Sequence, residues 1–266
     1  MSTNLLGTEA AVRSMNIPPA YQEPEEDQAK AENVQYLPFT VRQATNTDDL
    51  KKVVEVRQRA YARHLPLVAE SLKTPEPDDT EDGVVLLIAE SKVDGSALGT
   101  VRIQTNRVNP LNLEEFVALP EGLRGKTIAE VRRLGVAQGL PGRLVRMLLL
   151  KAVYQYCAHN NIDWILVGAR PPLDRMYEQL TLADVLPGKT FLPKQNNIPH
   201  RILGLEIRAF HDRLVASNNP LLEFFFYTQH PDIQRTCLEP LRWSGDREKL
   251  NTTFAQHSAG AEGSFS

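Results

Sequence analysis

The sequence has little cysteine and no long apolar run. Its 266 residues include two cysteines, Cys157 and Cys237, which lack the short spacing of a metal-binding pair. This usage favours a reducing compartment and structural thiols over a disulfide framework. The longest purely apolar run covers residues 84–89, far short of the roughly 20 residues that cross a bilayer.

Signals for secretion and for several common chemistries are also missing. The N-terminal segment has no basic stretch followed by an apolar core, which a signal peptide requires, so we expect a cytoplasmic protein. The net charge of −3 gives no indication of nucleic acid binding. We find no nucleophile signature and no set of metal ligands, and none of the six histidines has an evident catalytic partner.

What is present is a chain of ordinary globular composition with polar ends. Residues 1–35 carry six acids against Arg13 and Lys30, which indicates a disordered or loosely attached leader. Residues 244–266 are small and polar and are expected to form a flexible tail. Residues 36–243 are left as one domain, and no internal repeat divides them.

The domain is organised around residues 125–177. An alternating strand at 128–136 is followed by a Gly/Pro turn at 138–143, an apolar helix at 144–159, a second strand at 164–169 and a short helix after Pro172. A glycine-rich turn that opens a helix is suited to an anion such as phosphate. Upstream we expect a strand at 36–42, a helix capped by Thr47 that runs to about residue 64, a hairpin of strands 84–90 and 98–104, and an insertion at 107–127.

This order of elements resembles the GCN5-related N-acyltransferase fold from about residue 37 to 210. The segment 170–180 is similar to that family's short helix after its fifth strand, where a tyrosine faces the thioester sulfur, and Tyr177 falls at that place. The resemblance implies an α+β fold with a mixed central sheet flanked by helices. Residues 210–243 are expected to form an extra C-terminal helical segment.

Four short motifs resemble a narrower branch, the acyl-homoserine-lactone synthases and the related long-chain N-acyl amino acid synthases. These motifs are Arg57 with Tyr61, Asp79 with Asp82, Arg102 in the hairpin, and Glu130 with Arg133. The insertion also matches this branch. The tryptophans typical of the lactone synthases are replaced here, and the C-terminal segment is long, which favours the amino acid synthases.

Glu130 is the candidate base, because the amine of an amino acid is mostly protonated at neutral pH and must lose a proton to attack a thioester. In a regular strand Glu130 shares its face with Ile128, Leu134 and Val136, so the carboxylate is either buried and paired or functional. A structural ion pair with Arg132 or Arg133 is the alternative. Arg133 would lie on the opposite face of a flat strand, and the bulge implied by the resemblance would bring both residues to one cleft and aim an N–H at the oxyanion.

The remaining candidates have two interpretations each. Arg57, Arg102 and Arg133 can bind the substrate carboxylate or pair with Asp79 and Asp82, and the two aspartates can equally belong to a solvated acidic loop. The resemblance makes Tyr177 the proton donor to the leaving thiolate, although an aromatic residue on this helix can simply pack. Residues 224–226, three phenylalanines, can close or extend an acyl pocket.

The donor is expected to carry a 4′-phosphopantetheine arm, held by the turn residues Gln138, Gly139, Gly142 and Arg143. Residues 121–151 contain seven bases and two acids, which suits an acidic acyl carrier protein, although such charge can also serve solubility. Coenzyme A remains an alternative donor, and no permanently bound cofactor is expected.

We therefore expect an N-acyltransferase that moves a medium or long acyl chain from acyl carrier protein to the amine of an amino acid. The alternatives are an acyl-homoserine-lactone synthase that uses S-adenosylmethionine, an acetyl-CoA-dependent acetyltransferase, and a non-catalytic module that binds acyl groups or carrier protein. The partners would be the carrier protein and a small amino acid, with membrane contact restricted to a peripheral one through the product.

Overall fold

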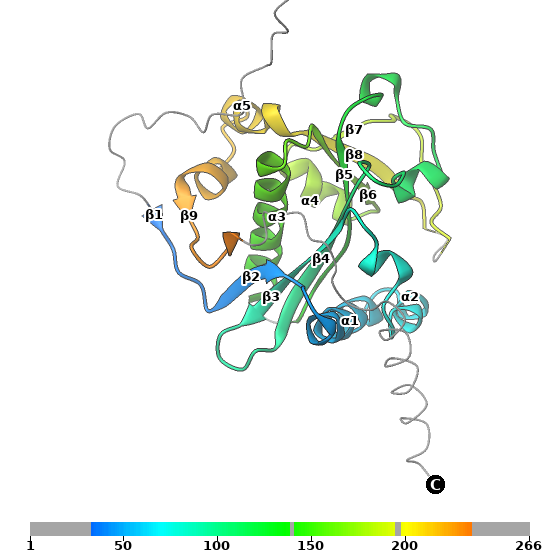
Figure 1. Ribbon diagram of the computed structural model, residues 1–266. Coiled ribbons are helices and arrows are strands. Elements are labelled where there is room, and N and C mark those ends of the chain that lie inside the picture. The colour runs from blue at the N-terminus through cyan, green and yellow to red at the C-terminus, as the bar shows by residue number, and fades with distance from the viewer. Residues whose placement is uncertain (1–32, 139–140, 195–197, 236–266) are drawn as a thin grey trace, which may run out of the picture. The chain divides into compact units, whose positions relative to one another are not determined.

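The computed structural model describes residues 33–138, 141–194 and 198–235 (Figure 1). The tail expected at 244–266 lies outside these residues, and so does most of the expected leader. Within the leader, Asn33–Val34 forms strand β1, so regular structure begins before the expected boundary at residue 35. Among the described residues, no helix is both long and apolar enough to cross a membrane.

A mixed sheet of seven strands forms the centre of the domain. Its strands, in spatial order, are β2 (Phe39–Gln43), β3 (Val84–Ser91), β4 (Ala97–Thr105), β5 (Ile128–Val136), β6 (Trp164–Ala169), β8 (Arg201–Glu206) and β7 (Ala183–Asp184). Strands β5 and β6 are parallel, and the other neighbours in this sheet are antiparallel. Strand β1 pairs separately with β9 (Thr228–Gln229).

Helices cover both faces of the sheet, and short helical turns fill the connections. The α-helices are α1 (Thr47–Ala62), α2 (Pro66–Ser71), α3 (Pro141–His159), α4 (Leu173–Gln179) and α5 (Phe210–Ala216). The turns are 3-10 helices η1 (Pro77–Thr80), η2 (Asn112–Glu115), η3 (Glu121–Leu123) and η4 (Ile207–Ala209), and the π-helical segment η5 (Glu223–Tyr227). The cap of α1 differs from the prediction, because Asn46 rather than Thr47 accepts the N–H of Asp49, at 3.0 Å.

The alternation along β3 divides the core between the two faces. Val85 and Leu87 belong to the large cluster beneath α3, whereas Leu86 and Ile88 pack with Leu50 of α1. Successive side chains of a strand point to opposite faces, so α3 and α1 lie on opposite sides of the sheet (Figure 1). A third cluster packs the 107–127 insertion against Ile128 and Leu166, on the same side as α1.

Strands β5 and β6 separate after a short paired stretch. Their register runs from Ile128 opposite Trp164 to Glu130 opposite Leu166, while β5 continues to Val136 and β6 to Ala169. Within these described strands the pairing does not continue past Glu130. The sheet therefore has an opening between neighbouring parallel strands, and Glu130 lies where the opening begins.

A β-bulge in β5 lies beside this opening. On the β4 side, Arg102 is opposite Arg132 and Thr100 is opposite Gly135, so β5 contains one extra residue. Arg133 takes the left-handed backbone conformation, with φ of 55°. The bulge expected from the family resemblance is therefore present.

A buried lysine of α3 binds the C-terminal segment at residues 224–230. Lys151 is 1% exposed, and its Nζ donates to the backbone oxygens of Phe224 (2.6 Å) and Thr228 and lies 3.1 Å from His230 Nδ1. Burial lowers the pKa of Lys151 to about 8. The sequence does not predict this role of Lys151, because its acceptors are backbone carbonyls, which every residue has.

Replacement of Lys151 by Met tests this attachment. The variant leaves two buried carbonyls without their donor, so we expect the free energy of unfolding to fall by about 1–3 kcal/mol. Amide hydrogen exchange should accelerate in residues 223–230 more than in β3 or β4. The matched control is Lys126→Met at an exposed position, and an equal loss in both variants would contradict the attachment.

Candidate active site

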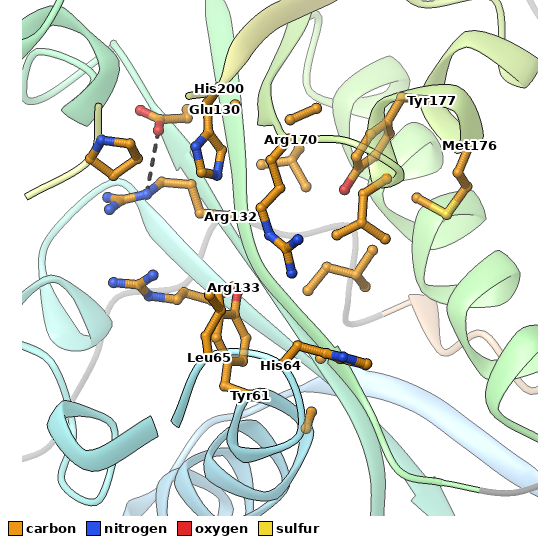
Figure 2. A pocket seen from close by; sticks show the side chains of 18 of the residues that line it. Tyr61, His64, Leu65, Glu130, Arg132, Arg133, Arg170, Met176, Tyr177 and His200 are labelled. Carbon is orange, nitrogen blue, oxygen red and sulfur yellow. Dashed lines mark ion pairs between the residues drawn. The ribbon is translucent and has the colours of Figure 1, made fainter. Parts of the chain in front are cut away.

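A cavity of about 290 Å³ lies where β5 and β6 separate. Residues 130–136 of β5 and 168–170 at the end of β6 line it, together with residues of α1, α4, the 107–127 insertion and the 191–200 segment. Figure 2 shows side chains from these elements directed toward the same space. The lining combines apolar side chains with charged ones, among them Glu130 and five arginines. A concave site in which polar groups converge is typical of small-molecule sites.

The cavity connects the two faces of the sheet. Glu130 shares a strand face with Ile128, which packs against the insertion, whereas Tyr177 belongs to the cluster beneath α3. Both side chains nevertheless line the same cavity. A carboxylate and a phenol can therefore reach a shared substrate from opposite sides (Figure 2).

Glu130 is 2% exposed and held by two contacts. One carboxylate oxygen accepts the backbone N–H of Leu113 at 3.0 Å, and the other lies 3.4 Å from Nε of Arg132. Burial raises the pKa of Glu130 above its ordinary value, although the charge of Arg132 and the Leu113 N–H act in the opposite direction. The ion pair considered as the alternative is thus present with Arg132, and it leaves Glu130 in the lining of the cavity.

The bulge changes which residues share the face of Glu130. Leu134 and Val136 contact the cluster beneath α3, as Val131 does, while Ile128 packs on the insertion side. The expectation that Leu134 and Val136 lie on the face of Glu130 is therefore wrong, because the extra residue reverses the alternation. Arg133 lines the cavity as expected.

Arg57, Asp79 and Arg102 form a fully buried ion network. Arg57 binds Asp79 through two hydrogen bonds of 2.9 Å, and Arg102 donates to the same carboxylate at 3.0 Å. All three side chains have no exposed surface. Among the described residues that line the cavity, none of these three is included.

Of the two interpretations given for Arg57 and Arg102, substrate binding or pairing with the aspartates, the structure shows pairing with Asp79. The acidic segment before β3 is anchored through Asp79, which is also bonded by the backbone N–H of Glu76. Asp82 is exposed and lies outside the lining of the cavity that the described residues form. The network therefore acts on the site through the position of β5 and of α1.

Glu76 joins this network to the bulge. Its carboxylate accepts Nε of Arg133 at 2.7 Å and lies 3.3 Å from Arg57 and 3.2 Å from Arg102. Burial alone would raise the pKa of Glu76, but hydrogen bonding from Arg133 and the three positive charges lower it to about 2. Sequence reasoning missed Glu76, although the pairing of three arginines with only two aspartates was a usable signal for a further acid.

The two tyrosines lie on different walls of the cavity. The ring centre of Tyr61, on α1, lies 6.0 Å from Cζ of Arg133. Helix α1 can approach β5 closely because Gly135 faces Ala60, and a Cβ on Gly135 would lie 3.2 Å from the Cβ of Ala60. Tyr177 is 9% exposed, and burial raises the pKa of its phenol above the ordinary value. Tyr177 packs in the cluster beneath α3 and also lines the cavity, so a packing role and a role as proton donor are compatible.

The turn that was expected to hold phosphopantetheine is only partly described. Gly139 is outside the described residues, Gln138 and Arg143 are exposed, and Gly142 is buried where a Cβ would come within 2.9 Å of the Ala137 carbonyl. None of the described turn residues belongs to the lining, but Arg146, one turn further along α3, does.

Arg146 and Arg170 are cations of the cavity that have no carboxylate partner among the described residues. Arg146 lies 3.9 Å from the sulfur of Met176, and Arg170 donates to the Pro171 carbonyl at 3.3 Å. They can therefore meet an anionic group of a substrate. Arg170 and His200 were missed from the sequence: Arg170 begins the segment 170–180, in which only Tyr177 was given a role, and His200 belongs to no motif.

The three phenylalanines of residues 224–226 lie elsewhere. Phe225 and Phe226 make ring contacts with Tyr154 of α3, and Phe224 contacts His230. They are absent from the cavity lining that the described residues form. The expectation that they close or extend the pocket is therefore not met, because they cover the far side of α3.

The Glu76 network should give a measurable acid dependence. A carboxylate whose folded pKa is about 2 contributes stability above its unfolded pKa of about 4.5, and this contribution is lost as pH falls from 4.5 to 2. Glu76→Gln should lower the free energy of unfolding at neutral pH by about 3 kcal/mol and flatten that acid slope. Denaturant titration across this pH range measures both effects.

The control for this prediction is Glu70→Gln, which removes an exposed ion pair with Lys73 and should cost less than about 1 kcal/mol. If both variants lose the same free energy of unfolding and show the same acid slope, Glu76 does not connect the ion network to the bulge.

Comparison with known proteins gives a family and a fold. The family model described as N-acyl amino acid synthase FeeM matches residues 52–206, more than half of the chain. Comparison with curated proteins gives no match.

Solved structures similar to this chain have low sequence identity. The structure of FeeM, an N-acyl amino acid synthase from uncultured soil microbes, is 15% identical, with a TM-score of 0.53 over 70% of this chain and 97% of that one. An aminoglycoside 6′-acetyltransferase type Ii is 14% identical, with a TM-score of 0.44 over 63% and 96%. Arabidopsis thaliana NAA60 in complex with acetyl-CoA is 14% identical, with a TM-score of 0.45 over 64% and 99%. The chain therefore belongs to the FeeM family of N-acyl amino acid synthases, and it is an acyltransferase with the GCN5-related N-acyltransferase fold.

Proposed function

We propose that this protein transfers a medium or long acyl chain from acyl carrier protein to the amine of an amino acid, by direct attack on the thioester. The observation that carries the proposal is the cavity at the opening between β5 and β6, which Glu130 and Tyr177 line from opposite faces of the sheet. An acyl donor and an amine must meet without a covalent enzyme intermediate, and a site open on two faces allows this.

Glu130 acts as the base that receives a proton from the attacking nitrogen, directly or through water. Its burial favours proton uptake, because the neutral carboxyl is better tolerated in a poorly solvated site. Tyr177 gives a proton to the departing sulfur, and a backbone N–H at the Arg133 bulge stabilises the developing oxyanion. Tyr61 and Arg133 shape the acceptor side.

The donor arm enters beside α3. Arg146 lines the cavity within the second turn of this helix, and Arg143 is exposed in the first. The helix dipole and these two charges favour a phosphate at this end, next to Gln138, Gly139 and Gly142. The basic excess of residues 121–151 supports an acidic carrier protein over free coenzyme A, because complementary charge speeds encounter.

The acceptor carboxylate has a partner in the cavity. Arg170 reaches into its centre (Figure 2) and has no acidic partner among the described residues. Arg132 is close by but is already engaged, 3.3 Å from Asp78 and 3.4 Å from Glu130. Arg170 is therefore the cation that we assign to the substrate carboxylate.

The function is tested by product analysis with the full chain. Purified protein is incubated with a dodecanoyl thioester on acyl carrier protein or on coenzyme A, with a panel of amino acids or with S-adenosylmethionine, and products are identified by mass spectrometry. We expect an N-acyl amino acid, formed with a kcat/KM at least about 10-fold higher from the carrier. A lactone as the main product, or equal use of both donors, would overturn the corresponding part of the proposal.

A charge variant separates carrier docking from chemistry. Arg143→Glu should reduce kcat/KM for the carrier-bound donor with increasing severity at low salt, and should change the coenzyme A reaction less. Arg208→Glu, at an exposed position on η4, is the matched control. Identical losses with both donors would argue against a carrier surface at this helix.

Glu130→Gln tests the base. The amide cannot take a proton, so kcat should fall by about 10²–10⁴ while the thermal unfolding midpoint stays near that of the parent. Glu121→Gln at an exposed position is the control. Unchanged turnover in a folded Glu130→Gln protein would exclude Glu130 as the base.

A further inference from the structure

Amide formation from an ammonium group requires the removal of two protons from nitrogen. The ammonium has three N–H bonds and the amide of the product keeps one. One of the two protons can finish on the thiol that leaves, and the other must reach solvent. Glu130 can take one proton at a time, so the cavity benefits from a second acceptor.

His200 supplies a second acceptor on the same face of the sheet as Glu130. It precedes β8 and lies two residues before Ile202, which packs with Ile128 and Leu113 in the insertion cluster. Because alternate residues of a strand share a face, His200 is on the insertion side. Its side chain lines the cavity, and Figure 2 shows it on the side of Glu130.

The backbone and the ring of His200 are fixed. Its N–H and C=O both pair with Phe191, at 2.9 Å in each direction, and its ring lies 5.6 Å from the Phe191 ring. The Phe191 ring is seated against Gly168 of β6, where a Cβ would come within 2.9 Å of Cζ. The imidazole is thus held by packing rather than by an exposed loop.

The hydrogen bond of the ring determines its tautomer. Nδ1 lies 2.7 Å from the backbone oxygen of Ile198, and a carbonyl oxygen can only accept, so Nδ1 carries a proton. In the neutral ring, Nε2 therefore holds a lone pair. Nε2 has no hydrogen-bond partner among the described residues, while both oxygens of Glu130 are engaged.

The charges around His200 favour the neutral ring. Burial lowers the pKa of His200, the Ile198 carbonyl acts in the opposite direction, and the positive charge of Arg170 lowers it further. On β5, the ion pair of Glu130 and Arg132 lies on the same face. Lys194, on the segment that carries Phe191, is engaged by Glu115. At neutral pH the ring is able to accept a proton.

We propose that Nε2 of His200 takes the first proton from the ammonium group of the acceptor. The N–H bond breaks, its electron pair stays on nitrogen as the attacking lone pair, and the imidazole becomes imidazolium. This inference rests on the proposed function, since it concerns the amine that is acylated.

The remaining steps balance with the roles already assigned. The amine adds to the thioester carbonyl, the C–S bond breaks, and the thiolate receives the Tyr177 proton. Glu130 takes the second proton from nitrogen. Glu130 then returns its proton to the Tyr177 phenolate and the imidazolium releases its own to solvent, so the net products are amide, thiol and one proton.

His200→Asn tests the assignment. The Asn amide nitrogen can keep the hydrogen bond to Ile198, because it stands where Nδ1 stands, and the variant lacks Nε2. We expect kcat/KM for the amino acid to fall by about 10²-fold near pH 7. The loss should shrink as pH rises to about 10, because the free amine then no longer needs a base.

Two further readouts separate catalysis from structure. Methoxyamine, an acceptor whose nitrogen is neutral at pH 7, should react with parent and variant at rates within about 3-fold of each other, well inside the usual range of general base effects. His159→Asn, at an exposed position at the end of α3, should behave as the parent with every acceptor. A His200→Asn loss that is the same at all pH values and with methoxyamine would overturn the proposal.

Nitrogen-15 NMR of the histidine rings tests the tautomer without turnover. The His200 signal, assigned in the parent protein by its proximity to the Phe191 ring, should show protonated Nδ1 and unprotonated Nε2 at pH 7. A protonated Nε2 would overturn the proposal even if the variant does not fold. Failure of the parent to acylate any amine would instead overturn the proposed function, and the two failures are thus distinguishable.

Discussion

The site depends on the hydrogen-bonded ion pair of Glu76 and Arg133. Arg133 adopts a φ of 55°, a conformation that costs a residue with a Cβ about 1 kcal/mol or more. The charged hydrogen bond to Glu76 offsets this cost and holds the extra residue of β5 in place. The bulge turns the face of β5 at the point where β6 separates from it. Without this turn, Glu130 and Arg133 would lie on opposite faces of the sheet.

The buried charges around this pair balance one another. Four arginines, at positions 57, 102, 132 and 133, face four carboxylates, at positions 76, 78, 79 and 130. Such a cluster gains little net stability over an apolar core, but the loss of one member leaves an unpaired charge. The cluster instead fixes geometry, because each bidentate pair holds a strand or a helix in one orientation. The set also explains why Glu130 differs from Glu76: it is approached by one arginine at 3.4 Å, so burial determines the direction of its pKa shift.

The elements nearest the site were predictable from the sequence. The bounds of β5 and β6 agree with the expected strands at 128–136 and 164–169, because an alternating segment and an apolar run each lie between clear turn signals. The bulge and Tyr177 were predictable only through the family resemblance. Local patterning could not give the alternation beyond Arg133, since a single extra residue changes the face of every residue that follows.

The residues that the sequence left open or misplaced share another physical cause. Arg57 and Arg102 kept two interpretations, substrate binding or pairing with Asp79 and Asp82, because an arginine alone does not reveal its partner, and the partners lie in a segment 19 to 26 residues away in sequence. His200 and Arg170 reach the cavity from the ends of β8 and β6, so no spacing rule connects them to Glu130. Residues 224–226 were assigned to the pocket by their chemistry, but Tyr154 of α3 and Phe210 of α5 already provide Phe225 and Phe226 with an aromatic surface.

The opening between β5 and β6 has a consequence for selectivity. The two faces of the sheet are built by different parts of the chain: α3 and α4 on one side, and α1 with the 107–127 and 191–200 segments on the other. Changes in the insertion alter the surroundings of Glu130 through Leu113 and Phe116, while the packing of α3 beneath Tyr177 stays the same. Substitutions of the α3 face alter the surroundings of Arg146 and Met176 and leave the ion network intact. A cavity that passes through a sheet therefore lets its two sides diverge independently, because the strands between them are held by the buried charges of β4, β5 and the segment before β3.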